Sequence, residues 1–148
     1  MARLDVRAVD VSSASATDLF FSGAQGNFWW SGNPIGQPVS SFFSNLRGAG
    51  HQVAMVRWVN GWYVPVPGAP LGMLAGACRV ATVIKAVHDR YPAPKFNVIG
   101  SSAGGAGVAY SLANYGVASL VNKAVIVSGP PFMEIAKGCE DVSGYAYR

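Results

Sequence analysis

Apolar positions along the chain fall into short runs typical of buried strands and longer segments with helical spacing. The runs predict strands at Ala2–Val11, Leu19–Ser22, Gln52–Trp58, Phe96–Gly100 and Ala124–Ser128. The helical spacing predicts helices at Pro38–Ala49, Leu71–Tyr91 and Ala103–Tyr115. The first strand alternates apolar and polar residues, which is typical of a sheet edge, and Ser12–Asp18 is expected to be a polar break.

The order of these elements predicts an α/β domain. Strands that are apolar throughout need cover on both faces, as in parallel sheets. We therefore expect a three-layer sandwich with a mostly parallel sheet of about five strands. The 148 residues suit one domain, covering 1–148.

Composition narrows the classes of protein to consider. Hydrophobic residues make up 51% of the chain and charged residues 12%, which excludes a disordered chain. No apolar run reaches the roughly 18 residues of a membrane span. Charged residues at Arg3, Asp5 and Arg7 interrupt the start of the chain, so no signal peptide is expected, and secreted and cytoplasmic locations both stay open.

Charge and cysteine usage argue against two further classes of function. The 11 basic residues are scattered singly, whereas nucleic-acid binders usually carry a stripe or cluster. Cys78 and Cys139 lack metal-site spacing, so no metal centre is expected. A disulfide between them and two buried thiols are both compatible with the sequence.

The pentapeptide Gly100-Ser101-Ser102-Ala103-Gly104 carries the candidate chemistry. It matches Gly-x-Ser-x-Gly, follows an apolar strand directly and leads into a helix, which is the context of a nucleophile elbow. Such a sharp turn strains the serine backbone, so Gly100 and Gly104 stand where a Cβ would collide with neighbouring chain. The turn is expected to present the Ser102 hydroxyl above the sheet, at the positive end of a helix.

Other readings of this glycine-rich turn are weaker. A dinucleotide loop would need glycine in place of Ser102, and the Gly-Lys-Ser/Thr triplet of a phosphate loop is absent. A tight turn with an incidental serine remains the alternative.

Around this motif the sequence resembles the α/β-hydrolase superfamily, specifically its serine esterases and lipases. Four segments are similar to the third to sixth strands of that fold with its oxyanion loop and elbow: Leu19–Gly26, Gln52–Trp58, Phe96–Ser102 and Ala124–Ser128. The resemblance implies an oxyanion hole made by the backbone N–H of Ala103 and that of Ala24 or Gln25. Ser22-Gly23 stands where the family commonly has His-Gly, but backbone donors do not require that histidine.

The resemblance also implies a catalytic acid and then a histidine later in the chain. No histidine follows Ser102, and the later acids are Glu134, Glu140 and Asp141, of which Asp141 is the preferred candidate. His51 precedes a strand and His88 lies near a helix end, so both are expected at the end of the sheet opposite Ser102. The chain therefore looks like the first two-thirds of the usual α/β-hydrolase fold, which makes it an incomplete α/β-hydrolase fold.

An incomplete sheet has an open edge. The strand at Ala124–Val127 would lie there, so a homodimer or higher oligomer through this strand is expected.

Aromatic residues suggest where a substrate lies. Trp29, Trp30 and Trp62 fall in loops that leave the carboxyl ends of strands, where Ser102 opens, and would form an apolar groove or pack on the core.

The leading hypothesis is a serine carboxylester hydrolase that acts on a small ester without a cofactor. Its activity would be weak, or would be completed by oligomerisation. The alternatives are a non-catalytic module for assembly or ligand binding, and one fragment of a longer enzyme.

Overall fold

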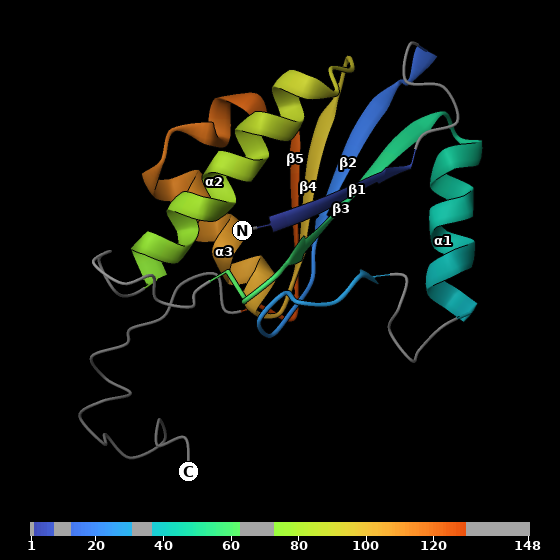
Figure 1. Ribbon diagram of the computed structural model, residues 1–148. Helices are drawn as coiled ribbons and strands as arrows, with labels where there is room; N and C mark the ends of the chain where they lie inside the picture. Colours follow the sequence, from blue (N-terminus) through green and yellow to red (C-terminus); the bar gives the residue numbers. More distant parts are fainter. Residues whose placement is uncertain (1, 8–12, 31–36, 63–72, 130–148) are drawn as a thin grey trace.

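The computed structural model describes residues 2–7, 13–30, 37–62 and 73–129. Their strands form one five-stranded sheet (Figure 1). The strand order is β1-β3-β2-β4-β5. In chain order the strands are β1 (Ala2–Arg7), β2 (Ala16–Phe21), β3 (His51–Trp58), β4 (Phe96–Ser101) and β5 (Lys123–Val127). β1 pairs antiparallel with β3, and the other neighbours pair parallel, which confirms a mostly parallel sheet.

Helices cover both faces of the sheet, so the expected three layers are present (Figure 1). Helix α1 (Gln37–Gly48) packs on β3 from one side. On the other side lie α2 (Met73–Arg90), α3 (Ala103–Asn114) and the short 3-10 helix η3 (Val117–Leu120). Each face of the sheet has its own apolar core. The core on the α1 side includes Phe20, Phe43 and Met55. The core on the α2 side includes Leu19, Ile84 and Val98. The turn from β4 into α3 therefore stands on a sheet packed from both sides.

Helix α2 packs through apolar residues with helical spacing, since Ala81, Ile84 and Val87 are buried. Leu74 and Cys78 continue that spacing toward the start of the helix, but both are exposed. Near the start of the helix the buried positions are instead Gly76 and Ala77, because this part of α2 packs against the glycine-rich start of α3. A Cβ at Gly107 of α3 would lie 3.1 Å from a methyl group of Val80, so the small residues let the two helices approach closely.

The expected polar break at Ser12–Asp18 is wrong for its last three residues, which form the buried start of β2. Their polar groups tolerate burial because each has partners. The Thr17 hydroxyl donates to the Tyr91 carbonyl at 2.8 Å. The Asp18 carboxyl lies 2.6 Å from His51 Nδ1 and accepts a 2.8 Å hydrogen bond from Asn97 Nδ2. Because these polar side chains have partners, the strand can start before the apolar run. Periodicity alone does not reveal such pairing, so the sequence pattern placed the start too late.

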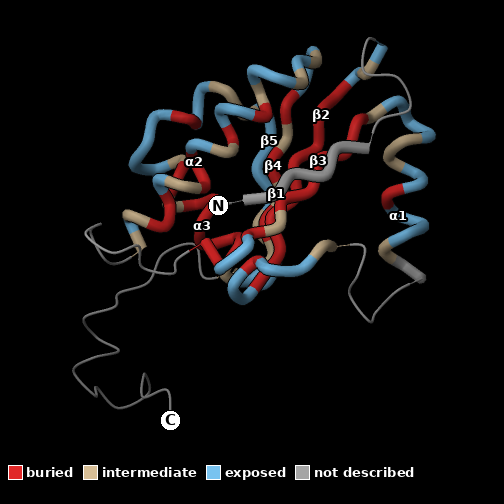
Figure 2. The backbone as a smooth tube through the Cα atoms, in the orientation of Figure 1, coloured by how far each residue is buried: buried red, intermediate tan, exposed pale blue. Residues whose placement is uncertain are grey.

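β5 forms one edge of the sheet and is the most exposed strand whose side chains are described (Figure 2). Ile126 points toward α3, where its methyl group would lie 2.9 Å from a Cβ at Gly105. Val125 and Val127 stay 39% and 42% exposed. Pairing of this edge with a second chain stays a prediction.

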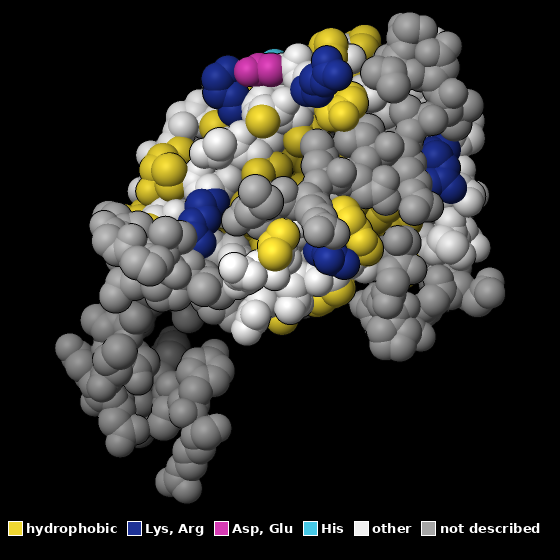
Figure 3. All heavy atoms as spheres, in the orientation of Figure 1, with side chains coloured by type: hydrophobic (Ala, Val, Ile, Leu, Met, Phe, Trp, Pro, Cys, Tyr) yellow, Lys and Arg dark blue, Asp and Glu magenta, His cyan; other side chains and the backbone are white. Residues whose placement is uncertain are grey.

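The surface gives two further findings. On the face drawn in Figure 3, Lys and Arg side chains of the described residues lie at separate places rather than in one patch. Within the described ranges, no helix is both long enough and apolar enough to cross a bilayer.

Replacing His51 by Ala should lower the free energy of unfolding by about 1–3 kcal/mol, because the buried Asp18 carboxyl then loses a hydrogen-bond donor. Urea unfolding followed by circular dichroism measures the change. His88→Ala is the matched control, because the His88 side chain is 37% exposed and contacts a surface carboxyl, which predicts a loss below about 1 kcal/mol. Equal effects of the two substitutions would contradict a structural role for the Asp18–His51 pair.

Candidate active site

Ser102 occupies the single residue between the end of β4 and the start of α3. Its φ of 50° and ψ of −124° form a strained combination for a residue with a side chain. Its backbone N–H donates to the Val127 carbonyl at 2.8 Å, and its carbonyl accepts from the Ala106 N–H at 3.1 Å. The residue is exposed, and its hydroxyl makes no capping hydrogen bond to α3. The backbone is thus held on both sides while the hydroxyl faces outward.

The two motif glycines lie where the chain passes closest to itself. A Cβ at Gly100 would come within 2.7 Å of backbone atoms of Gly104 and Gly105. A Cβ at Gly104 would come within 2.5 Å of the Ser22 carbonyl oxygen and 2.7 Å of that of Phe21. Because backbone cannot move away as a flexible side chain can, only glycine fits these two positions.

A pocket of about 280 Å³ opens beside the elbow. Its lining comes from the loop after β2 and from the elbow itself, and consists of Ser22, Gly23, Ala24, Phe28, Trp30, Ser101 and Ser102. A Cβ at Gly23 would lie 2.9 Å from the Ser102 Cβ, so the loop packs directly on the serine. This volume suits a small group with an apolar wall on one side.

The residues expected to form an oxyanion hole lie in different positions relative to this pocket. Ala24 lines it with a positive φ of 48°. Ala103 is the first residue of α3, so its N–H has no partner within the helix. Gln25 is not a lining residue, and its carbonyl instead accepts from the Trp62 N–H at 3.2 Å. Of the three expected donors, Ala24 alone lines the pocket, and Ala103 does not line it.

The three tryptophans expected near a substrate lie in three different environments. Trp30 lines the pocket and packs edge-on against Phe20, with ring centroids 5.4 Å apart. Trp29 is half-buried beneath the Arg57 guanidinium, which lies 5.6 Å from the ring centroid. Trp62 is 1% exposed in the core rather than at the pocket. Of the three, only Trp30 is placed to touch a small molecule at Ser102.

Trp62 has a supporting role that sequence patterning missed. Its indole Nε1 donates to the Ala24 carbonyl at 3.3 Å, and its own carbonyl accepts from Arg79 Nη1 at 2.9 Å. The core side chain thereby fixes the loop that forms one wall of the pocket. The closely spaced glycines Gly23 and Gly26 are the sequence feature that indicates a tight turn in this loop. In the structure Gly26 has a positive φ, and its N–H donates to the Gly23 carbonyl.

Both histidines of the sequence lie at the end of the sheet opposite Ser102. His51 is the first residue of β3, and the His88 ring packs against Phe96, the first residue of β4, with centroids 5.3 Å apart. Ser102 follows the last residue of β4, roughly 20 Å away at about 3.3 Å per residue. Neither ring can reach the serine hydroxyl. Asp141, Glu134, Glu140 and Cys139 lie outside the described residues.

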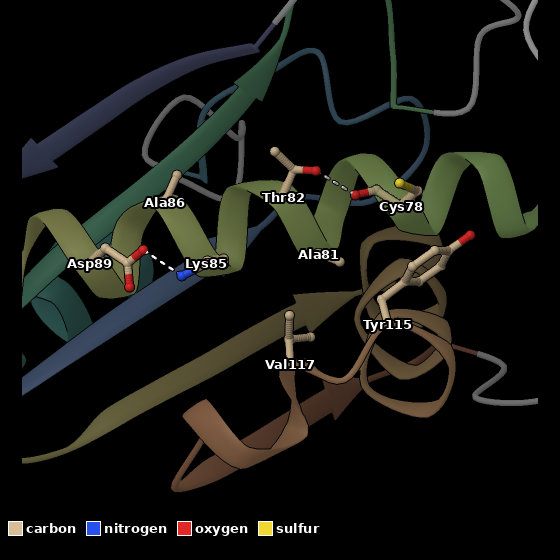
Figure 4. A pocket seen from close by; sticks show the side chains of 8 residues that line it. All are labelled: Cys78, Ala81, Thr82, Lys85, Ala86, Asp89, Tyr115 and Val117. Atoms are coloured by element: carbon tan, nitrogen blue, oxygen red, sulfur yellow. Dashed lines mark hydrogen bonds and ion pairs between the residues drawn. The ribbon is translucent and has the colours of Figure 1, made fainter.

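A second pocket of about 460 Å³ lies on the outer surface, between α2 and the segment around η3 (Figure 4). Cys78, Thr82 and Lys85 line it from α2, and Tyr115 and Val117 close it from below. Lys85 Nζ lies 2.7 Å from the Asp89 carboxyl. Hydrogen bonds from Lys85 and then His88 hold the pKa of Asp89 below its ordinary value. The ion pair is solvent-exposed, and the groove contains no strained residue, unlike the pocket at Ser102.

A family model described as the alpha/beta hydrolase fold matches residues 3–138. The chain therefore belongs to the alpha/beta hydrolase family. No curated protein matches the sequence.

Solved structures with this fold include esterases and lipases. The mature Bacillus licheniformis lipase BlEst2 matches with a TM-score of 0.62 and 14% identity, over 97% of this chain and 53% of the lipase. Est1E from Butyrivibrio proteoclasticus matches with a TM-score of 0.62 and 14% identity, over 93% of this chain and 50% of that protein. A bacterial brefeldin A esterase matches with a TM-score of 0.55 and 16% identity, over 83% of this chain and 34% of that protein. The chain thus spans about half the length of the first two.

Replacing Gly104 by Ala should lower the free energy of unfolding by about 3 kcal/mol or more, because the new methyl group overlaps two carbonyl oxygens of β2 and its loop. Thermal and urea unfolding measure the change. Gly48→Ala is the control: nothing lies within 4 Å of a Cβ there, so the variant should gain about 0.4–1 kcal/mol. A Gly104→Ala variant as stable as Gly48→Ala would show that the turn is not so tightly packed.

Proposed function

We propose that the protein is a serine carboxylester hydrolase in which Ser102 is the nucleophile. The observation that supports this most is the strained, exposed Ser102 backbone at the junction of β4 and α3, facing a pocket. A conformation of this kind persists only where surrounding structure enforces it, and strained residues cluster at active sites.

In this proposal the Ser102 hydroxyl attacks the ester carbonyl carbon and forms a tetrahedral intermediate. The backbone N–H groups of Ala103 and Ala24 stabilise the negative oxygen that develops there. The alcohol then leaves, and water hydrolyses the acyl-enzyme to release the acid. No metal or organic cofactor takes part in these steps.

The pocket beside Ser102 favours a small ester. Its volume of about 280 Å³ lies just below the range of ordinary ligand pockets, and Phe28 and Trp30 give it an apolar wall. We therefore propose a short or compact apolar acyl group as the preferred one.

A serine hydrolase also needs a base to accept the hydroxyl proton. His51 and His88 are both too far away to act as this base, and Asp141 stays the proposed acid. Oxyanion stabilisation and binding alone leave about 10³–10⁴-fold catalysis over water when triad members are removed. Weak hydrolysis without a histidine is therefore expected.

The positions of the two histidines also favour a second candidate function. A non-catalytic module that binds a small apolar ligand would keep the pocket and need no base. Such a module would show no hydrolysis that depends on Ser102.

Hydrolysis of p-nitrophenyl acetate should be slow, should disappear in Ser102→Ala and should increase when free imidazole is added. Imidazole replaces the missing base, and general bases contribute about 10²–10⁴-fold, so a gain of about tenfold or more is expected. The measured quantity is the rate of the wild type minus that of Ser102→Ala at each imidazole concentration, because imidazole itself cleaves this ester.

Ser101→Ala is the matched control, since Ser101 lines the same pocket without the strained backbone. It should keep most of the hydrolytic rate. Identical rates for the wild type and Ser102→Ala at every imidazole concentration would favour the binding module instead.

A further inference from the structure

The loop after β2 is held through three consecutive carbonyl groups. The indole Nε1 of Trp62 donates to the Ala24 carbonyl at 3.3 Å, and its backbone N–H donates to the Gln25 carbonyl at 3.2 Å. The backbone N–H of Trp58 donates to the Gly26 carbonyl at 2.8 Å. The end of β3 and the residues that follow it therefore bind one side of this loop.

A carbonyl that is held in place also orients the N–H of its own peptide group. In a trans peptide the C=O and N–H point in opposite directions. The Gly23 carbonyl accepts from the Gly26 N–H at 2.8 Å, so the Ala24 N–H points away from Gly26. Ala24 itself has a φ of 48°, which a residue with a side chain adopts only where its surroundings enforce it. Because Ala24 lines the pocket, these hydrogen bonds set the direction of the N–H proposed to bind the oxyanion.

The Trp62 ring connects this loop to α3. A Cβ at Gly107 would lie 3.5 Å from both Cη2 and Cζ3 of Trp62, so the edge of the ring rests on the helix. Gly107 follows Ala103, the first residue of α3, by about one helical turn. One rigid side chain thus lies between the helix that carries the Ala103 N–H and the loop that carries the Ala24 N–H.

Arg79 fixes Trp62 relative to α2. Its Nη1 donates to the Trp62 carbonyl at 2.9 Å, and a hydrogen bond from a charged donor is roughly twice as strong as a neutral one. The next residue, Val80, is buried, and its methyl group would lie 3.1 Å from a Cβ at Gly107. Arg79 therefore extends from a part of α2 that packs closely on α3.

We propose that Trp62 and Arg79 are positioning residues that set the spacing between the two oxyanion donors, the N–H groups of Ala24 and Ala103. Neither residue lines the pocket: Trp62 acts through the Ala24 carbonyl, and Arg79 acts through Trp62. Oxyanion donors act mainly where negative charge develops in the transition state, so a change in their spacing lowers kcat and leaves KM nearly unchanged. This kinetic effect rests on the proposed function, whereas the hold of Arg79 on Trp62 does not.

Hydrogen exchange measured by NMR tests that hold without requiring hydrolysis. In Arg79→Ala the Trp62 indole N–H should exchange about tenfold faster, because the residue has lost a hydrogen bond from a charged donor. Arg79→Lys keeps a cationic donor and should restore most of the protection. Arg90→Ala is the matched control, since Arg90 is an exposed residue of the same type at the end of α2, and it should leave the exchange unchanged. Unchanged exchange in Arg79→Ala would overturn the proposal.

Kinetics then test the effect on the oxyanion donors. The rate of p-nitrophenyl acetate hydrolysis minus that of Ser102→Ala, with imidazole present, gives kcat and KM at a temperature where unfolding curves show every variant folded. Arg79→Ala should lower kcat about 10- to 100-fold, because small misplacements of catalytic groups have effects of this size, and KM should stay within about twofold. Arg79→Lys should recover most of kcat, and Arg90→Ala should keep it. A raised KM with an unchanged kcat would contradict the positioning role.

A second variant tests whether Arg79 acts through Trp62. A tryptophan analogue at position 62 with sulfur in place of the indole N–H keeps the ring shape and removes the donor to Ala24. It should lower kcat with KM unchanged, and Arg79→Ala on this background should add less than about a threefold loss, because residues that act through one contact are not additive. Full, multiplicative losses would overturn the proposal.

Two outcomes separate this proposal from the proposed function. Arg79-dependent exchange in a protein without Ser102-dependent hydrolysis would contradict the proposed function, and with it the kinetic effect, but not the hold of Arg79 on Trp62. Ser102-dependent hydrolysis that is the same in the wild type and Arg79→Ala would contradict the positioning role alone.

Discussion

The close passage of backbone past backbone at the turn from β4 into α3 is the constraint on which the site depends. Gly100 lies against the first turn of α3, and Gly104 lies against the carbonyl oxygens that end β2. These contacts leave Ser102 with a positive φ and its hydroxyl outside the helix. The cost of that strained backbone, of order 1–3 kcal/mol, is offset by a sheet packed on both faces.

The same constraint explains why the neighbouring loop matters. Gly23 packs on Ser102, and the loop that contains it is fixed by the core residue Trp62 through the Ala24 carbonyl. On the other side, β5 supplies the carbonyl that holds the Ser102 N–H. The serine is therefore positioned by three neighbours in the sheet layer, namely β4, the loop after β2 and the end of β5. A change in any one of them is transmitted to Ser102.

Much of this arrangement could be predicted from the sequence, because apolar runs, helical spacing and glycine punctuation report local structure directly. The elbow was predictable since Gly-x-Ser-x-Gly between a strand and a helix has one steric explanation. The early start of β2 was not, because burial of Asp18 depends on His51 and Asn97, which are distant in sequence. The exposure of Leu74 and Cys78 on α2 and the buried position of Trp62 likewise depend on which elements become neighbours, and local patterns do not encode that.

Labelling with a fluorophosphonate, located by mass spectrometry of the digested protein, measures the reactivity of Ser102 most directly. The account predicts that the probe modifies Ser102, that Ser101 stays unmodified, and that Gly23→Ala slows the labelling because its methyl group displaces the serine. Absence of label on Ser102, or equal label on Ser101, would contradict a nucleophile prepared by the turn.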